Sequence, residues 1–188
     1  SLAEGLVPVY SVSGITDWAT LTYASIPITY DATWNEATAI WTNNGYRLPT
    51  EMEWMWAAMG APADGQEGLT NTTGYLKAFA GSTGSNAIGD YAWYDSNSAG
   101  KTHPVGTKDA NELGLYDMSG NVWEWCWDWY DTYPAGTQTD YQGAASGTNR
   151  VLRGGTWYGN ASYCPVAIRN YGNPHGQFIS VGFRVVRP

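Results

Sequence analysis

Cationic side chains are scarce in this 188-residue sequence. Only 9 Lys and Arg stand against 17 Asp and Glu, which gives a formal net charge of −8 at pH 7. Binding to phosphate backbones requires clustered cations, so nucleic acid is excluded as a partner. Long apolar runs are also missing, and no part of this chain is expected to insert into a membrane. The chain starts at Ser1 without Met, so we expect any targeting or anchoring segment to lie in a longer precursor.

Cysteine and phenylalanine are rare as well. The 2 cysteines, Cys126 and Cys164, could form one disulfide or remain as two free thiols, and the sequence does not decide between these alternatives. Only 3 Phe accompany 11 Trp and 14 Tyr, and 23 residues are Gly. Indole and phenol rings carry a polar group at one end, which suits half-wet surfaces and cores rich in loops. The length fits one domain over residues 1–188.

Two helices are predicted in the first third of the chain. In residues 31–41, Trp34, Ala37 and Trp41 recur at helical spacing, before a stop at 43–45. Further on, Thr50 and Glu53 form a capping box that predicts a helix ending at Gly60.

Long loops and short strands are predicted for the rest. Residues 60–112 are expected to form ordered loops, and short strands are expected near 151–152 and 181–186. In the predicted strand 122–130, the tryptophans at 123, 125, 127 and 129 alternate and should share one face. That face is either core or a platform for sugar stacking. The fold class is therefore α+β, with regular structure in the minority.

Four motifs in order carry a resemblance: LPTE at 48–51, GLYDMSGNVWEW at 114–125, RVLRGGTW at 150–157 and GFRVV at 182–186. Together they resemble the formylglycine-generating-enzyme, or sulfatase-modifying-factor, domain over roughly residues 25–188. The resemblance implies a C-type lectin fold of the sulfatase-modifying-factor type, with two helices, short antiparallel strands and long ordered loops. Because this fold hosts enzymes and binding modules alike, function has to come from the site.

The enzymes of that family carry a cysteine pair after RGG, which binds copper. Cys164 matches the second position, whereas Gly159 occupies the first, and one thiolate cannot reproduce a two-thiolate site. The related sulfoxide synthases need a histidine triad, and only His103 and His175 are present here. The resemblance therefore implies no enzymatic activity and no required cofactor. The alternative is a sulfatase-modifying-factor-like enzyme with altered thiol chemistry, which needs Cys164 exposed and reactive.

Residues 150–188 also resemble the variable region of Treponema-type variable proteins, which a diversity-generating retroelement diversifies. In that family adenines are replaced, mostly at AAC codons, while framework residues stay fixed. Only Gln177 lies outside the permitted set among the candidate positions. The predicted variable, ligand-binding residues are Tyr158, Gly159, Asn160, Ser162, Tyr163, Pro165, Ile168, Asn170, Tyr171, Gly172, Asn173, His175, Gly176, Phe178 and Ser180.

This second resemblance implies a non-enzymatic display protein at the cell surface, anchored as a lipoprotein. Its ligand would be a variable protein or another macromolecular surface, contacted mainly through Tyr158, Tyr163, Tyr171, His175 and Phe178. A structural surface protein without a specific ligand is a third reading.

The first resemblance implies a structural calcium site as well. Asp117 and Glu124 would supply carboxylates, and Gly120 and Val122 would supply carbonyls. The alternative for the two acids is a role in hydrogen bonds or salt bridges that tie loops together. For the arginines at 47, 153, 169 and 184 we expect such a role, with Glu51, Glu53 and Glu124 as partners.

Overall fold

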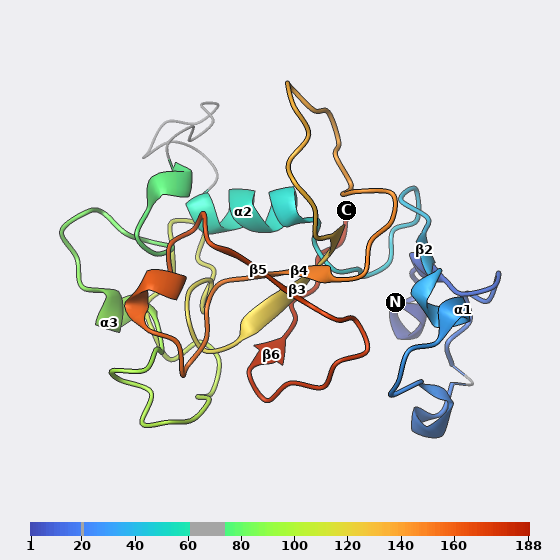
Figure 1. Cartoon of the computed structure of the whole chain (residues 1–188), viewed down its shortest axis with the longest axis horizontal. Coiled ribbons are helices and arrows are strands. Elements are labelled where there is room, and N and C mark those ends of the chain that lie inside the picture. Colours follow the sequence, from blue (N-terminus) through green and yellow to red (C-terminus); the bar gives the residue numbers. More distant parts are fainter. Residues whose placement is uncertain (20, 61–73) are drawn as a thin grey trace.

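Short helices and strands joined by long loops make up the protein (Figure 1). The computed structural model describes residues 1–19, 21–60 and 74–188. The helices are α1 (Ala32–Asn35), α2 (Glu51–Met59) and α3 (Ile88–Tyr91). The strands are β1 (Tyr10–Ser11), β2 (Thr38–Ala39), β3 (Trp123–Trp129), β4 (Arg150–Arg153), β5 (Arg169–Gly172) and β6 (Val181–Gly182). This is the predicted α+β class. Among the described helices, none has the length and apolar character needed to cross a membrane.

A four-stranded sheet in the order β5-β4-β3-β6 forms the centre, and β1 and β2 form a separate pair. Neighbours β3–β4 and β4–β5 are antiparallel, as predicted, but β6 runs parallel to β3. Two antiparallel steps make β5 parallel to β3 as well, so β5 and β6 point the same way at opposite edges. The chain must therefore cross the sheet between them through residues 173–180.

Helix α2 forms as the capping pattern predicts, and it lies across the central sheet (Figure 1). The Thr50 hydroxyl accepts from the Glu53 amide, and the Glu53 carboxylate accepts from the Thr50 amide at 2.8 Å. Gly60, with φ of 88°, ends the helix in the left-handed conformation. Trp54 and Ala58 are buried against the sheet.

The prediction of a helix over 31–41 is wrong beyond its first turn. Asp31 caps α1, but the helix stops at Asn35 and the chain enters β2. Thr38 and Ala39 pair there with Ser11 and Tyr10, so pairing with a distant strand overrides helical spacing. The short α3 lies where only loops were expected, and part of that expectation, at 61–73, falls outside the described residues.

Trp123 is buried, but the other three tryptophans of β3 do not lie on its fully buried face. Glu124, Cys126 and Asp128 are buried, whereas Trp125, Trp127 and Trp129 are partly buried. The ring of Tyr10 stacks on Trp127 with centroids 4.8 Å apart, and the Arg150 guanidinium lies 3.6 Å from the Trp129 centroid. These contacts cover the indoles, so they form a second packing layer and leave no platform for sugars.

Beneath α2, the carboxylate of Glu51 is the centre of a buried ion network. It is 2.7 Å from Arg153 and accepts from Arg169 at 2.7 and 2.8 Å. Glu51 and Arg153 are 2% and 0% exposed, and the Glu51 amide donates to buried Asp128 at 2.7 Å. Burial raises the pKa of Asp128 to about 6.

The arginines have the predicted partners. Arg47 pairs with Glu53 on the surface, and Arg184 pairs with Glu124. The cations therefore tie segments together rather than forming a cationic cluster.

Glu51→Gln should destabilise the fold by about 3–5 kcal/mol, because it leaves the buried Arg153 charge without its partner. Glu53→Gln is the matched control: its ion pair is half-exposed, glutamine can also serve in a capping box, and we expect a change within about 1 kcal/mol. Denaturant unfolding measures both. Equal, small effects would contradict the dependence of the fold on Glu51.

Candidate ligand-binding surface

The loop that follows β4 begins at two positions whose backbone conformation favours glycine. Gly154 and Gly155 have φ of 99° and 85°, in the left-handed region. A Cβ on Gly155 would also lie 2.9 Å from the carbonyl oxygen of Tyr163. The RGG motif thereby turns the chain sharply back, so that the 3-10 turn η4 (Ala161–Tyr163) lies against the start of the loop.

The backbone of this loop is bonded to framework groups along its length. The Trp157 amide donates to the Asn121 carbonyl at 2.8 Å, and the Gly159 carbonyl accepts from the Asp95 amide at 3.0 Å. The Ser119 hydroxyl donates to the Cys164 carbonyl at 3.0 Å. The Arg153 guanidinium donates to the carbonyls of Val166 and Ile168, both at 3.0 Å. The path of the loop is therefore set by its backbone and by framework side chains.

The side chains of this region fall into two exposed groups. Among the predicted ligand-binding residues, the exposed ones are Tyr158, Asn160, Ser162, Tyr163, Tyr171, Asn173 and Phe178. In Figure 1 the segment around η4 lies near α3, whereas the 173–180 loop lies on the far side of β6. The exposed predicted residues therefore form two separate groups, one at 158–163 and one at 171–178.

Three predicted residues are buried and present no side chain to a ligand: Gly159, Gly172 and Ser180. A Cβ on Gly172 would lie 2.7 Å from the Trp125 ring, so a side chain there requires the indole to move. Codon patterns carry no information about burial, which explains the difference. The remaining predicted residues are partly buried: Pro165, Ile168, Asn170, His175 and Gly176.

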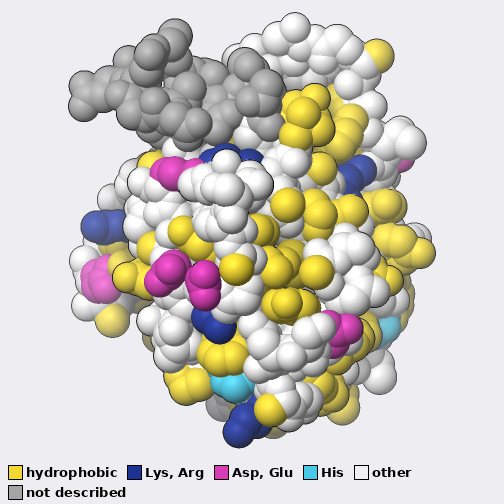
Figure 2. All heavy atoms as spheres, turned by 90° about the vertical axis from the view of Figure 1, so that its left-hand side faces the viewer, with side chains coloured by type: hydrophobic (Ala, Val, Ile, Leu, Met, Phe, Trp, Pro, Cys, Tyr) yellow, Lys and Arg dark blue, Asp and Glu magenta, His cyan; other side chains and the backbone are white. Residues whose placement is uncertain are grey.

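Aromatic contacts hold some exposed rings in place. Tyr158 packs edge-on against Trp157 at 5.2 Å, and Tyr163 against Trp123 at 6.1 Å. Tyr171 lies 4.7 Å from the Tyr130 ring. The face seen in Figure 2 carries scattered charged side chains, and Lys and Arg do not gather among the residues drawn in colour.

Both thiols are free and buried. Cys164 is 1% exposed, and burial, followed by the charge of Asp95, raises its pKa to about 12. Burial also raises the pKa of Cys126 well above the usual range. Such thiols are poor nucleophiles and poor metal ligands, so the exposed, reactive Cys164 that an altered thiol enzyme requires is contradicted by this geometry.

Of the two carboxylates predicted to bind calcium, Glu124 is already engaged by other groups and Asp117 only in part. Glu124 accepts from the Trp54 indole at 2.6 Å and from Arg184 at 2.5 and 2.6 Å, so its charge is already neutralised. Asp117 accepts from the Gly106 amide at 2.7 Å, and its other carboxylate oxygen is buried without a partner. The described residues contain no group of three or more His, Cys, Asp or Glu able to hold a metal. Glu124 instead ties segments together, which is the alternative role considered for it.

Sequence reasoning missed a cleft between α2 and residues 133–142. None of the predicted ligand-binding residues lines it. Thr50, Glu53 and Val186 belong to motifs identified in the sequence, but those motifs do not indicate that their segments meet the distant loop 133–142 in a cleft.

Comparison with known proteins places these features in a family. Residues 20–188 match the sulfatase-modifying factor enzyme 1-like domain, close to the predicted extent of 25–188. Chaperone protein LppX of Paenibacillus barcinonensis is 32% identical over 204 residues, covering 100% of this chain and 63% of LppX. The formylglycine-generating enzyme of Thermomonospora curvata is 37% identical over 162 residues, covering 80% of this chain and 52% of the enzyme.

Among solved structures, Treponema denticola variable protein 1 superposes with a TM-score of 0.85 at 41% identity, covering 100% of this chain and 65% of that one. The predicted resemblance to variable proteins with this fold is confirmed. The chain spans about half to just under two thirds of the length of these relatives. By its motifs, its fold and its match over residues 20–188, the chain belongs to the sulfatase-modifying factor enzyme 1-like domain family.

Proposed function

We propose that the chain is a non-enzymatic ligand-binding protein whose C-terminal region is diversified by a retroelement. The similarity to Treponema denticola variable protein 1 over the whole chain supports this role. The proposal rests on how the loop after β4 is held. Framework groups form hydrogen bonds with the loop backbone, while the side chains of Tyr158, Asn160, Ser162 and Tyr163 are exposed to solvent. Substitution at Tyr158, Ser162 and Tyr163 changes the surface without removing these framework bonds, whereas the Asn160 side chain also caps η4 by accepting from the Ser162 amide.

The exposed side chains have the composition of adaptable binding surfaces. Tyr158, Tyr163 and Tyr171 offer rigid amphipathic contact area, and Asn160, Ser162 and Asn173 offer hydrogen bonds. The ligand in this proposal is a macromolecular surface, such as another protein, because the two exposed groups are spread over the molecule rather than gathered in one pocket. The proposal includes display at the cell surface, with the protein held as a lipoprotein through a segment outside this chain.

Sequencing of the gene from many isolates tests diversification. Substitutions should concentrate in the codons of the exposed positions, where a nearby template copy of the gene has adenines. Framework residues such as Arg153 and Trp157 should not vary.

Antibody labelling of intact cells tests surface display. Cells labelled with antibody against the framework should stain without permeabilisation. Identical 158–180 segments in all isolates would favour a structural surface protein instead, and staining only after permeabilisation would contradict surface display.

Tyr158→Ala and Phe178→Ala should each change the free energy of unfolding by less than about 1 kcal/mol, because both rings are half-exposed. Val151→Ala, at a fully buried framework position, is the matched control and should cost more, about 1–3 kcal/mol. Denaturant unfolding gives the comparison. A loss of folding in the two ring variants would show that these residues belong to the core and would defeat the display proposal.

Reactivity of the two thiols toward a thiol-specific reagent distinguishes the proposal from the enzyme alternative. That alternative is considered because formylglycine-generating enzymes are among the relatives. Both thiols are buried, with raised pKa values, so native protein should react negligibly at neutral pH and both should react once unfolded. Cys164→Ser and Cys126→Ser assign any signal. Rapid native labelling of Cys164 would revive thiol chemistry.

A further inference from the structure

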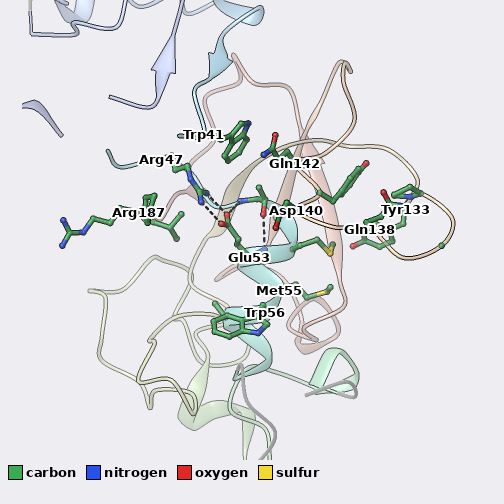
Figure 3. Close-up of a pocket in the computed structure, with 18 residues that line it drawn as sticks. Trp41, Arg47, Glu53, Met55, Trp56, Tyr133, Gln138, Asp140, Gln142 and Arg187 are labelled. Atoms are coloured by element: carbon green, nitrogen blue, oxygen red, sulfur yellow. Dashed lines mark hydrogen bonds and ion pairs between the residues drawn. The ribbon is translucent and has the colours of Figure 1, made fainter. Parts of the chain in front are cut away.

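The cleft beside α2 is large enough to hold an organic ligand. Its volume is about 1020 Å³, at the upper end of the roughly 300–1,000 Å³ of ligand pockets. One wall is the exposed side of α2, the opposite wall is the loop 133–142, and residues 186–188 lie at one end (Figure 3).

Aromatic rings lie at both ends of the cleft and on its wall. Trp41 and Trp56 stand at opposite ends in Figure 3, with Glu53 and Met55 between them. Trp56 is 50% exposed, and no aromatic or cation–π contact covers its ring within the described part of the chain. Tyr133 is similarly exposed on the opposite wall.

Tyr133 and the helix that carries Trp56 are both held by the framework. The Tyr133 hydroxyl donates to Glu51 at 3.0 Å and accepts from Arg153 at 2.8 Å, so the buried ion network fixes the loop wall. Trp56 stands on α2, whose first turn is held by the capping box and by the same Glu51. Side chains on rigid elements make a preorganised site, which loses little entropy when a ligand binds.

The cationic and anionic side chains that line the cleft are equal in number among the described residues. Arg47 and Glu53 form an ion pair there, and the exposed cation Arg187 is offset by the exposed anion Asp140. In the described structure the carboxylate of Asp140 and the amide of Gln142 have no hydrogen-bond or ion-pair partner, although both line the cleft. The cleft thus offers donors and acceptors without an excess of either charge.

We propose that this cleft binds a neutral oligosaccharide. The apolar C–H faces of sugar rings pack on exposed indole and phenol rings. Sugar hydroxyl groups donate to carboxylate and amide oxygens, and they accept from amide and guanidinium N–H groups. A phosphorylated or strongly acidic ligand would require an excess of cations, and a purely apolar ligand would leave the polar wall unpaired. The site is separate from the diversified loop and uses no metal.

Titration calorimetry with maltotriose, cellotriose and chitotriose tests the proposal, with trigalacturonate as an anionic comparison. At least one neutral trisaccharide should bind saturably, with the same affinity in EDTA. Trp56→Ala should weaken binding about tenfold, equivalent to about 1.4 kcal/mol, and Gln142→Ala should weaken it less. Circular dichroism checks that the variants fold, which the half-exposure of Trp56 favours.

Tyr158→Ala is the matched control, since its ring is as exposed as Trp56 but lies on the diversified loop; it should leave saccharide binding unchanged. No saturable binding to any neutral trisaccharide would overturn the proposal, as would stronger binding of trigalacturonate or unchanged binding in folded Trp56→Ala. Loss in Tyr158→Ala with retention in Trp56→Ala would place sugar binding on the loop and also overturn it. None of these outcomes bears on retroelement diversification, which rests on gene sequences.

Discussion

The buried carboxylate of Glu51 is the interaction on which the rest of the structure depends. It stands in the first turn of α2 and receives Arg153 from β4 and Arg169 from β5, so one side chain joins three elements. A buried ion costs several kcal/mol unless it is paired and hydrogen-bonded. Alternative registers of β4 or β5 would separate these charges, so the network favours one arrangement of helix and sheet over its neighbours.

The same network supports both surfaces proposed to bind ligands. On one side Arg153 also donates to the loop carbonyls of Val166 and Ile168. On the other it donates to Tyr133, on the wall of the cleft. A single buried guanidinium therefore fixes two exposed walls built from segments far apart in the sequence. Rigid support beneath exposed rings is what allows their substitution without a change of fold.

The sequence predicted those features whose causes are local. The capping box of Thr50 and Glu53 and the stop at Gly60 depend on neighbouring residues, and they appear as expected. The predicted helix at 31–41 is wrong beyond its first turn because Thr38 and Ala39 pair with β1, which lies much earlier in the sequence. Burial of Gly172 and Ser180 depends on packing by β3 and the sheet edge, which codon patterns cannot register. The cleft combines α2 with a distant loop, and the local motifs that mark α2 do not indicate this long-range contact.

The difference between an enzyme and a display protein on this scaffold comes down to what the loop after RGG offers to solvent. At the position of the enzymes' first thiol this chain has Gly159, where a Cβ would meet the Tyr163 ring at 3.1 Å. The remaining thiol, Cys164, faces inward and packs with Phe79 and Ala92. With the sulfur inside, the exposed predicted positions carry rings, amides and a hydroxyl, which in the proposed function recognise surfaces by contact and hydrogen bonding. Backbone bonds of the kind that hold this loop could position a catalytic pair in an enzyme, and in the proposed function they hold a variable set of side chains, because neither role requires the loop backbone to move.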